Sequence, residues 1–148
     1  MPQSLSAIYV QAVFSTMNRN PYLHDSELRR RMHGYLVGTS KGLGCPTIQV
    51  GGTADHVHVL AILGRTTTQA DWIRDLKRAS AKWVKPQVPD FAWQAGYGMF
   101  SVGHDGVEGV KAYVANQEEH HRRVSFQEEY LQMLKDYGLE WDKRYLWD

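Results

Sequence analysis

The chain has 148 residues, of which 43% are hydrophobic and 22% charged, and its formal net charge is +1 at pH 7. This length and composition are typical of one folded domain and exclude disordered and fibrous proteins. The longest uncharged apolar stretch, residues 57–64, is far shorter than the roughly 20 residues of a membrane-spanning helix, and the one cysteine cannot form an internal disulfide. We therefore expect a single cytoplasmic domain over residues 1–148, with no membrane partner.

The first half of the chain predicts a strand, a helix and a strand pair. Residues 7–15 are β-branched and aromatic and precede turn-forming asparagines, which indicates a buried strand at the centre of a sheet. Residues 26–37 repeat apolar side chains at helical spacing until glycines interrupt the pattern. Two β-rich runs, 47–50 and 56–63, are joined by five residues and fit a hairpin.

The second half predicts another strand and three helices. Thr68 and Asp71 form a capping box ahead of an amphipathic helix. Residues 99–102 predict a strand, and further caps predict helices over about 105–123 and 125–138. This order favours an α+β fold of the ferredoxin-like or RRM-like kind, in which helices pack on a mostly antiparallel sheet.

The triplet His56-Val57-His58 is the first candidate site. Residues two apart in a strand point to the same face, so the two imidazoles stand side by side and suit one metal ion. Two polar rings on an otherwise apolar strand also need partners for their nitrogens. The same pattern fits two histidines on a half-exposed sheet face, and the residues alone leave both interpretations open.

Tyr113 and Gln117 form the second candidate. They lie four residues apart in a predicted helix, one turn above each other beside its apolar seam. A tyrosine with a packed ring and a glutamine at the helix edge have the same spacing, and periodicity alone favours that simpler interpretation.

The helix after Thr68 carries a basic face, which is the third candidate. Positive charge on one face suits a phosphate backbone, although a solvated face explains the charges equally well. Aromatic residues within 91–100 could stack unpaired bases, but such residues more often belong to the core. The basic face consists of Arg74, Lys77, Arg78, Lys82 and Lys85.

In combination, these motifs resemble the single-tyrosine HUH transposases of small bacterial insertion sequences (insertion-sequence-200-like transposases) and the repeat-associated tyrosine transposases. The resemblance covers nearly the whole chain, and its most specific parts are the two histidines and the Tyr-Gln helix pair, in this order. The segments that carry it, with the basic helix between the first two, are GGTADHVHVLAIL, FAWQAGYGMFSV, VKAYVANQEEHHRR and RYLWD.

The resemblance implies a DNA transposase that cuts and rejoins single-stranded DNA beside a hairpin through a 5′-phosphotyrosine intermediate. It implies Tyr113 as the nucleophile, with His56, His58 and Gln117 as ligands of a divalent metal. It further implies a homodimer in which the tyrosine helix of one subunit completes the site of the other. For such a mixed imidazole and amide site we expect Mg²⁺ in cells, with Mn²⁺ equal or better in vitro.

Some neighbouring residues carry weaker assignments. Gln11 stands where many relatives have a histidine, a departure from the family pattern. His120 and His121 are interpreted as exposed helix histidines, and Asp55 fits either an acceptor for a neighbouring histidine or a turn cap. Residues 145–147 are expected to pack on the core or on a partner subunit.

The alternative function is a non-catalytic, domesticated module that binds single-stranded nucleic acid through the sheet face and the basic helix, since ferredoxin-like sheets commonly do so. The presence of Tyr113, Gln117 and both histidines of the triplet favours the enzyme.

Overall fold

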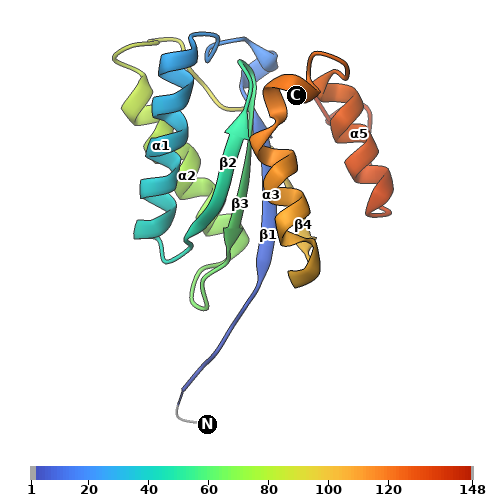
Figure 1. The fold of residues 1–148 in the computed structure, drawn as a ribbon. Helices are drawn as coiled ribbons and strands as arrows, with labels where there is room; N and C mark the ends of the chain where they lie inside the picture. Colours follow the sequence, from blue (N-terminus) through green and yellow to red (C-terminus); the bar gives the residue numbers. More distant parts are fainter. Residues whose placement is uncertain (1–2, 148) are drawn as a thin grey trace.

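A computed structural model describes residues 3–147 of the chain as an antiparallel sheet covered by helices on both faces (Figure 1). The sheet has the order β2-β3-β1-β4, and every neighbouring pair is antiparallel. The predicted α+β fold, the hairpin and the central position of the first strand are therefore confirmed. The strands are β1 (Tyr9–Ser15), β2 (Thr47–Gly52), β3 (His56–Ile62) and β4 (Gly98–Val102).

Three of the helices begin at a side chain that accepts hydrogen bonds from the first turn. Thr68 accepts from the Asp71 amide and Ser125 from the Glu128 amide, as the sequence predicts, and Asp25 does the same for the first helix. No helix within residues 3–147 is long and apolar enough to cross a membrane. The helices are α1 (Ser26–Gly42), α2 (Gln69–Val84), α3 (Val107–Ala115), α4 (Gln117–His120) and α5 (Phe126–Asp136).

The first helix is longer than predicted. It continues through Gly38 to Gly42 because the buried side chains of Met32, Leu36 and Ser40 hold its inner face against the rest of the protein. Ser40 Oγ also accepts a 2.9 Å hydrogen bond from the Trp72 indole. This packing outweighs the cost of about 1 kcal/mol that a glycine adds inside a helix.

The prediction of one continuous helix over residues 105–123 is wrong. Asn116, with φ −99° and ψ 21°, divides it into α3 and α4. Asp105 also provides no cap, because the residue that precedes α3 at its N-terminus is Gly106, which has no side chain to accept a hydrogen bond. The break turns the chain so that Gln117, the first residue of α4, is completely buried.

The two faces of the sheet carry different kinds of residue. Helices α1 and α2 cover one face of the sheet (Figure 1). They enclose the larger apolar core, which includes Val57, Val59 and Trp72. Helix α3 packs over β2 and β3 on the other face, and α5 packs on that face beside β1 and β4. Because side chains alternate along a strand, His56 and His58 point to this second face.

Helix α3 approaches β2 so closely that only glycine fits beneath it. A Cβ at Gly51 would overlap the carbonyl oxygen of Val114, which is backbone and cannot rotate away. The absence of this side chain sets the height of α3, and therefore of Tyr113, above the sheet.

We predict that Gly51→Ala lowers the free energy of unfolding by about 1–3 kcal/mol, because the added methyl group must displace α3. The matched control is Gly109→Ala in α3, where a Cβ meets no atom within 4 Å, and which should raise stability by about 1 kcal/mol. Urea unfolding of both variants measures the difference. Equal stability of the two variants would contradict the close approach.

Candidate active site and metal centre

Three imidazoles and a carboxylate converge on the second face of the sheet. The ligand atoms of His56, His58, His121 and Glu129 lie within 4.8 Å of one another. The two strand histidines are completely buried, and Glu129, from the first turn of α5, is 4% exposed. We call these four residues the histidine–glutamate cluster.

Each histidine of the cluster is oriented by an oxygen on its outer side. His56 Nδ1 lies 2.9 Å from Asp55 Oδ1, and His58 Nδ1 lies 2.9 Å from Gln11 Oε1. His121 Nδ1 donates to a main-chain carbonyl, that of residue 124, at 2.7 Å. A ring that carries its hydrogen on Nδ1 presents an Nε2 lone pair, and all three Nε2 atoms face the centre of the cluster.

Gln117 and Glu129 supply oxygen atoms to the same centre. Gln117 Oε1 lies 3.1 Å from His56 Nε2 and 2.9 Å from His121 Nε2. Glu129 Oε1 lies 2.9 Å from His58 Nε2 and 3.2 Å from His121 Nε2. The side-chain amide of Gln117 also donates to Glu129 Oε2 at 3.1 Å, which fixes its oxygen toward the histidines.

Tyr113 reaches the cluster through Glu129. Its hydroxyl donates a hydrogen bond to Glu129 Oε2, while Oε1 of the same carboxylate faces His58 and His121. Burial, followed by the nearby carboxylate, raises the pKa of the Tyr113 hydroxyl, so the group is a neutral phenol at pH 7. A nucleophilic role would require a proton acceptor, and Glu129 is the acceptor in contact.

For two groups of the cluster, Glu129 and His58, burial shifts the pKa in one direction and the neighbouring polar groups shift it in the other. Burial alone would raise the pKa of Glu129, but its close contacts with His121 and His58 outweigh this effect and hold the pKa well below its usual range. Burial lowers the pKa of His58 to about 4, against the opposing effect of Glu129, so its ring is neutral near pH 7. A carboxylate and an uncharged imidazole are the forms that bind metal ions.

The structure brings together all four residues predicted for catalysis and metal binding. Tyr113, His56, His58 and Gln117 belong to one network of contacts on the second sheet face, although their chemical roles stay predictions. The completely buried histidine pair excludes the half-exposed sheet face. Asp55 contacts His56, which decides between its two proposed roles in favour of the histidine acceptor.

Sequence reasoning missed two members of the cluster. His121 was expected to be an exposed helix histidine, but it stacks edge-on against His56 at 4.6 Å between ring centroids. Glu129 was not singled out. The sequence pattern that could have identified Glu129 is the presence of an acidic residue on the apolar side of α5, between Phe126 and Leu134, which are both buried. His120 lies nearby, with Nε2 3.1 Å from Glu129 Oε2 but without hydrogen-bond geometry.

The basic face lies in a different layer from the cluster. Helix α2 covers the opposite side of the sheet (Figure 1). Its residues Arg78, Lys82 and Lys85 are exposed. Arg74 forms ion pairs with Asp71 and Asp75 on the same helix. The structure therefore does not place these charges beside the histidines.

Lys77 differs from the rest of the basic face because it is partly buried. Its ammonium donates to the main-chain carbonyls of Gln94 and Gly96 at 2.8 and 2.7 Å, and burial lowers the pKa of Lys77 to about 8. Lys77 thus holds the loop before β4 in place, whatever its role toward DNA.

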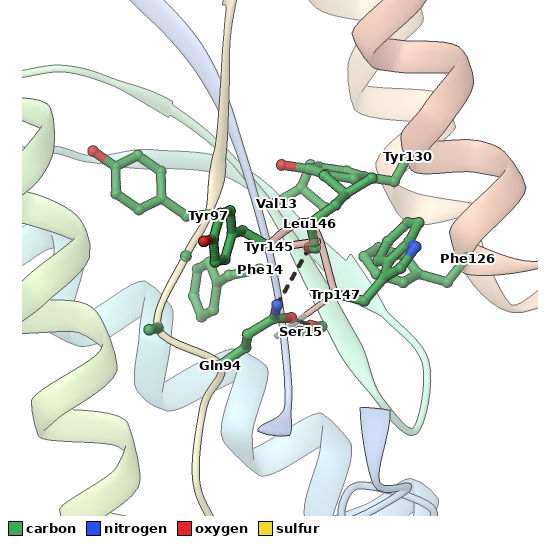
Figure 2. Close-up of a pocket in the computed structure, with 12 residues that line it drawn as sticks. Val13, Phe14, Ser15, Gln94, Tyr97, Phe126, Tyr130, Tyr145, Leu146 and Trp147 are labelled. Carbon is green, nitrogen blue, oxygen red and sulfur yellow. Dashed lines mark hydrogen bonds between the residues drawn. The ribbon is translucent and has the colours of Figure 1, made fainter. Parts of the chain in front are cut away.

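A cavity of about 350 Å³ with aromatic walls lies next to the cluster, and Figure 2 shows Tyr97, Tyr130 and Trp147 around it. Phe126 joins the two regions, because it lines the cavity and stacks on His56 with 4.2 Å between ring centroids. Residues 145–147 close one side, so the expected packing of this segment on the core is confirmed. Of the aromatic residues within 91–100, the buried ones, Phe91, Trp93 and Phe100, belong to the core.

Comparison with known proteins identifies a family match over most of the chain. Residues 4–117 match the family model described as "Transposase IS200 like". None of the curated proteins compared with the chain matches it.

Two solved structures share the fold. A Deinococcus radiodurans R1 protein assigned as a transposase superimposes with a TM-score of 0.62 at 20% identity, covering 77% of this chain and 93% of that chain. A REP-associated tyrosine transposase bound to a REP hairpin superimposes with a TM-score of 0.56 at 9% identity, covering 76% of this chain and 67% of that chain.

We predict that His56 is the Nδ1–H tautomer in the metal-free protein, because the Asp55 carboxylate can only accept a hydrogen bond. Long-range ¹H–¹⁵N correlation spectra of the imidazole nitrogens measure this directly. Asp55→Asn, whose amide can also donate, should populate the Nε2–H tautomer, whereas Asp105→Asn at an exposed position should not. An Nε2–H tautomer in the unaltered protein would rule out the orienting role of Asp55.

Proposed function

Since this chain belongs to the IS200-like transposase family, we propose that it cleaves and rejoins single-stranded DNA beside a hairpin through a covalent bond to Tyr113. The observation that carries the proposal is the contact network itself. One buried carboxylate contacts the Tyr113 hydroxyl through one oxygen and His58 through the other. A potential nucleophile and a potential metal centre are thereby held side by side, as a single-tyrosine HUH transposase requires.

The residues present fit a divalent metal. His56 Nε2, His58 Nε2 and Gln117 Oε1 would hold it, and the ion would supply Lewis-acid polarisation of the scissile phosphate. The surrounding residues keep these ligands in place: Asp55 and Gln11 fix the two imidazole rings. Gln11, where many relatives have a histidine, therefore has a positioning role in this proposal.

In the proposed step, the Tyr113 oxygen attacks phosphorus and forms the 5′-phosphotyrosine bond while the bond to the 3′ oxygen breaks. The phenol proton passes toward Glu129, which already accepts the hydroxyl hydrogen bond. The leaving 3′ oxygen takes up that proton from Glu129 and so becomes a hydroxyl. A 3′-hydroxyl from another strand can reverse the step, so strands are rejoined without an external energy source.

The cavity beside Phe126 offers a place for unpaired nucleotides next to the scissile bond. Its aromatic walls suit base stacking, which is tolerant of sequence and needs an unpaired base. Single-stranded DNA is therefore the proposed substrate on this side of the molecule. Hairpin contacts are proposed for the exposed charges of α2, which lie on the other side of the sheet and would reach duplex phosphates away from the cleavage point.

A homodimer with Tyr113 acting in trans stays a prediction. The arrangement within one chain already places the Tyr113 hydroxyl on the carboxylate that contacts its own His58. This contact supports cleavage by Tyr113 within its own subunit as the working arrangement.

We predict that Tyr113→Phe abolishes the covalent protein–DNA product but changes DNA affinity by no more than a few fold, because only the attacking oxygen is lost. Denaturing gels with 5′-labelled downstream strand of the hairpin substrate and Mn²⁺ measure the adduct. Tyr137→Phe, which removes only an exposed hydrogen bond to Ser101, is the control and should keep it. Chelation should abolish the adduct in the unaltered protein. Binding without any adduct in the unaltered protein would favour the non-catalytic module.

We predict that replacing Arg78 and Lys82 together by alanine weakens binding to the hairpin and lowers the slope of log affinity against log salt by about 1.4 to 1.8. The reason is that each phosphate contact releases close to one counterion. The control is a double variant, Lys41→Ala with Lys135→Ala, which also removes two positive charges, but from exposed positions of α1 and α5. It should change the slope less. The same slope in both double variants would show that α2 does not contact the hairpin DNA.

A further inference from the structure

We propose that His121 and Glu129 are themselves metal ligands, and that they make the centre selective for transition-metal ions such as Mn²⁺ and Co²⁺ over Mg²⁺. This inference rests on the metal centre of the proposed function and extends it from three protein donors to five. Both residues lie after residue 117, where the family match ends, so they belong to a part of the chain that the match does not cover.

The first argument is the orientation of the donors. The Nδ1 atoms of His56, His58 and His121 face oxygens outside the cluster, so their Nε2 lone pairs face inward. The oxygens of Gln117 and Glu129 face the same centre. Five electron-pair donors therefore point at one centre, and one cation satisfies all of them.

The second argument is the spacing of the donors. Ligand atoms about 2.1 Å from one ion lie about 3 Å apart when they are neighbours in an octahedral shell. Gln117 Oε1 lies 3.1 Å from His56 Nε2 and 2.9 Å from His121 Nε2. Glu129 Oε1 lies 2.9, 3.2 and 3.7 Å from the Nε2 atoms of His58, His121 and His56. Four of these five separations match the edges of one coordination shell, and the fifth, between His56 Nε2 and Glu129 Oε1, is longer.

The third argument is burial. Glu129 Oε1 faces three imidazoles inside the protein, and the side chain is 4% exposed. Tyr113 and Gln117 donate to Oε2, so the other oxygen of this buried carboxylate faces the imidazoles alone. Burying such an oxygen without a strong partner is costly, and a divalent ion is the strongest partner that the surrounding ligand atoms allow. Exposed acidic clusters need no such partner, which sets this site apart from them.

Selectivity follows from the kind of donor. Mg²⁺ prefers oxygen ligands and keeps several of its waters, whereas imidazole suits Mn²⁺, Co²⁺ and Zn²⁺ better. A third imidazole and the loss of water positions both act against Mg²⁺. With five protein donors, a six-coordinate ion would keep one position for a phosphate oxygen, so the centre would stay compatible with the proposed cleavage.

The direct test uses the unaltered protein with Co²⁺. Paramagnetic ¹H NMR shows one strongly shifted, solvent-exchangeable N–H signal for each coordinated imidazole that keeps its Nδ1 hydrogen. We expect three such signals, from His56, His58 and His121. Two signals would exclude His121 from the centre. The count depends on neither DNA nor cleavage.

Calorimetric titration of the metal-free protein tests affinity. We expect Mn²⁺ and Co²⁺ to bind at least about tenfold more tightly than Mg²⁺. Glu129→Gln and His121→Gln should each weaken Co²⁺ binding by at least about tenfold, because each removes a donor or weakens it. The matched controls are Glu128→Gln, in the same helical turn, and His104→Gln, both at exposed positions, which should bind Co²⁺ as the unaltered protein does.

Equal affinity for Mg²⁺ and Mn²⁺, or unchanged Co²⁺ binding in both site variants, would overturn the inference. These results are separable from failure of the proposed function. Three imidazole signals without a covalent DNA product would support the five-donor centre and contradict the proposed transposase chemistry. Two imidazole signals, together with a product that forms equally well with Mg²⁺ and Mn²⁺, would support the transposase chemistry and contradict the five-donor centre.

Discussion

The buried carboxylate of Glu129 is the interaction on which the arrangement of the second sheet face depends. A charge so far from solvent is stable only if several polar groups reach it, and here they come from β3, α3, α4 and the chain after α4. These contacts attach α5 to the sheet, set the direction of Gln117 and hold the Tyr113 hydroxyl. One acidic side chain thereby links the position of the nucleophile to that of the metal ligands.

The strands and the connection between α3 and α4 bring this carboxylate its partners. Alternation along β3 sends both histidines to the same face, while the valines between and after them enter the core on the other. The turn at Asn116 then directs Gln117 inward, and Phe126 stacks on His56 as α5 begins. The apolar layer of α1 and α2 provides a rigid support, so the polar layer can carry the chemistry.

Much of this could be predicted from the sequence, because the informative patterns are local. Strand periodicity found the histidine pair, and caps at Thr68 and Ser125 located two helices. Glu129 was missed because its partner His58 is 71 residues away, and no spacing rule connects an acid in one helix with a ring in a strand. Lys77 was grouped with its basic neighbours by charge, since only the folded loop before β4 reveals the carbonyls that it binds.

The central claim is that the Tyr113 oxygen, held beside a metal centre, becomes bonded to DNA. The most direct measurement is mass spectrometry of the protein after reaction with hairpin DNA and Mn²⁺, followed by nuclease and trypsin digestion. The account predicts a nucleotide attached to Tyr113 within the tryptic peptide of residues 112–122. A nucleotide on another residue, or no modified peptide while the DNA is cut, would contradict it.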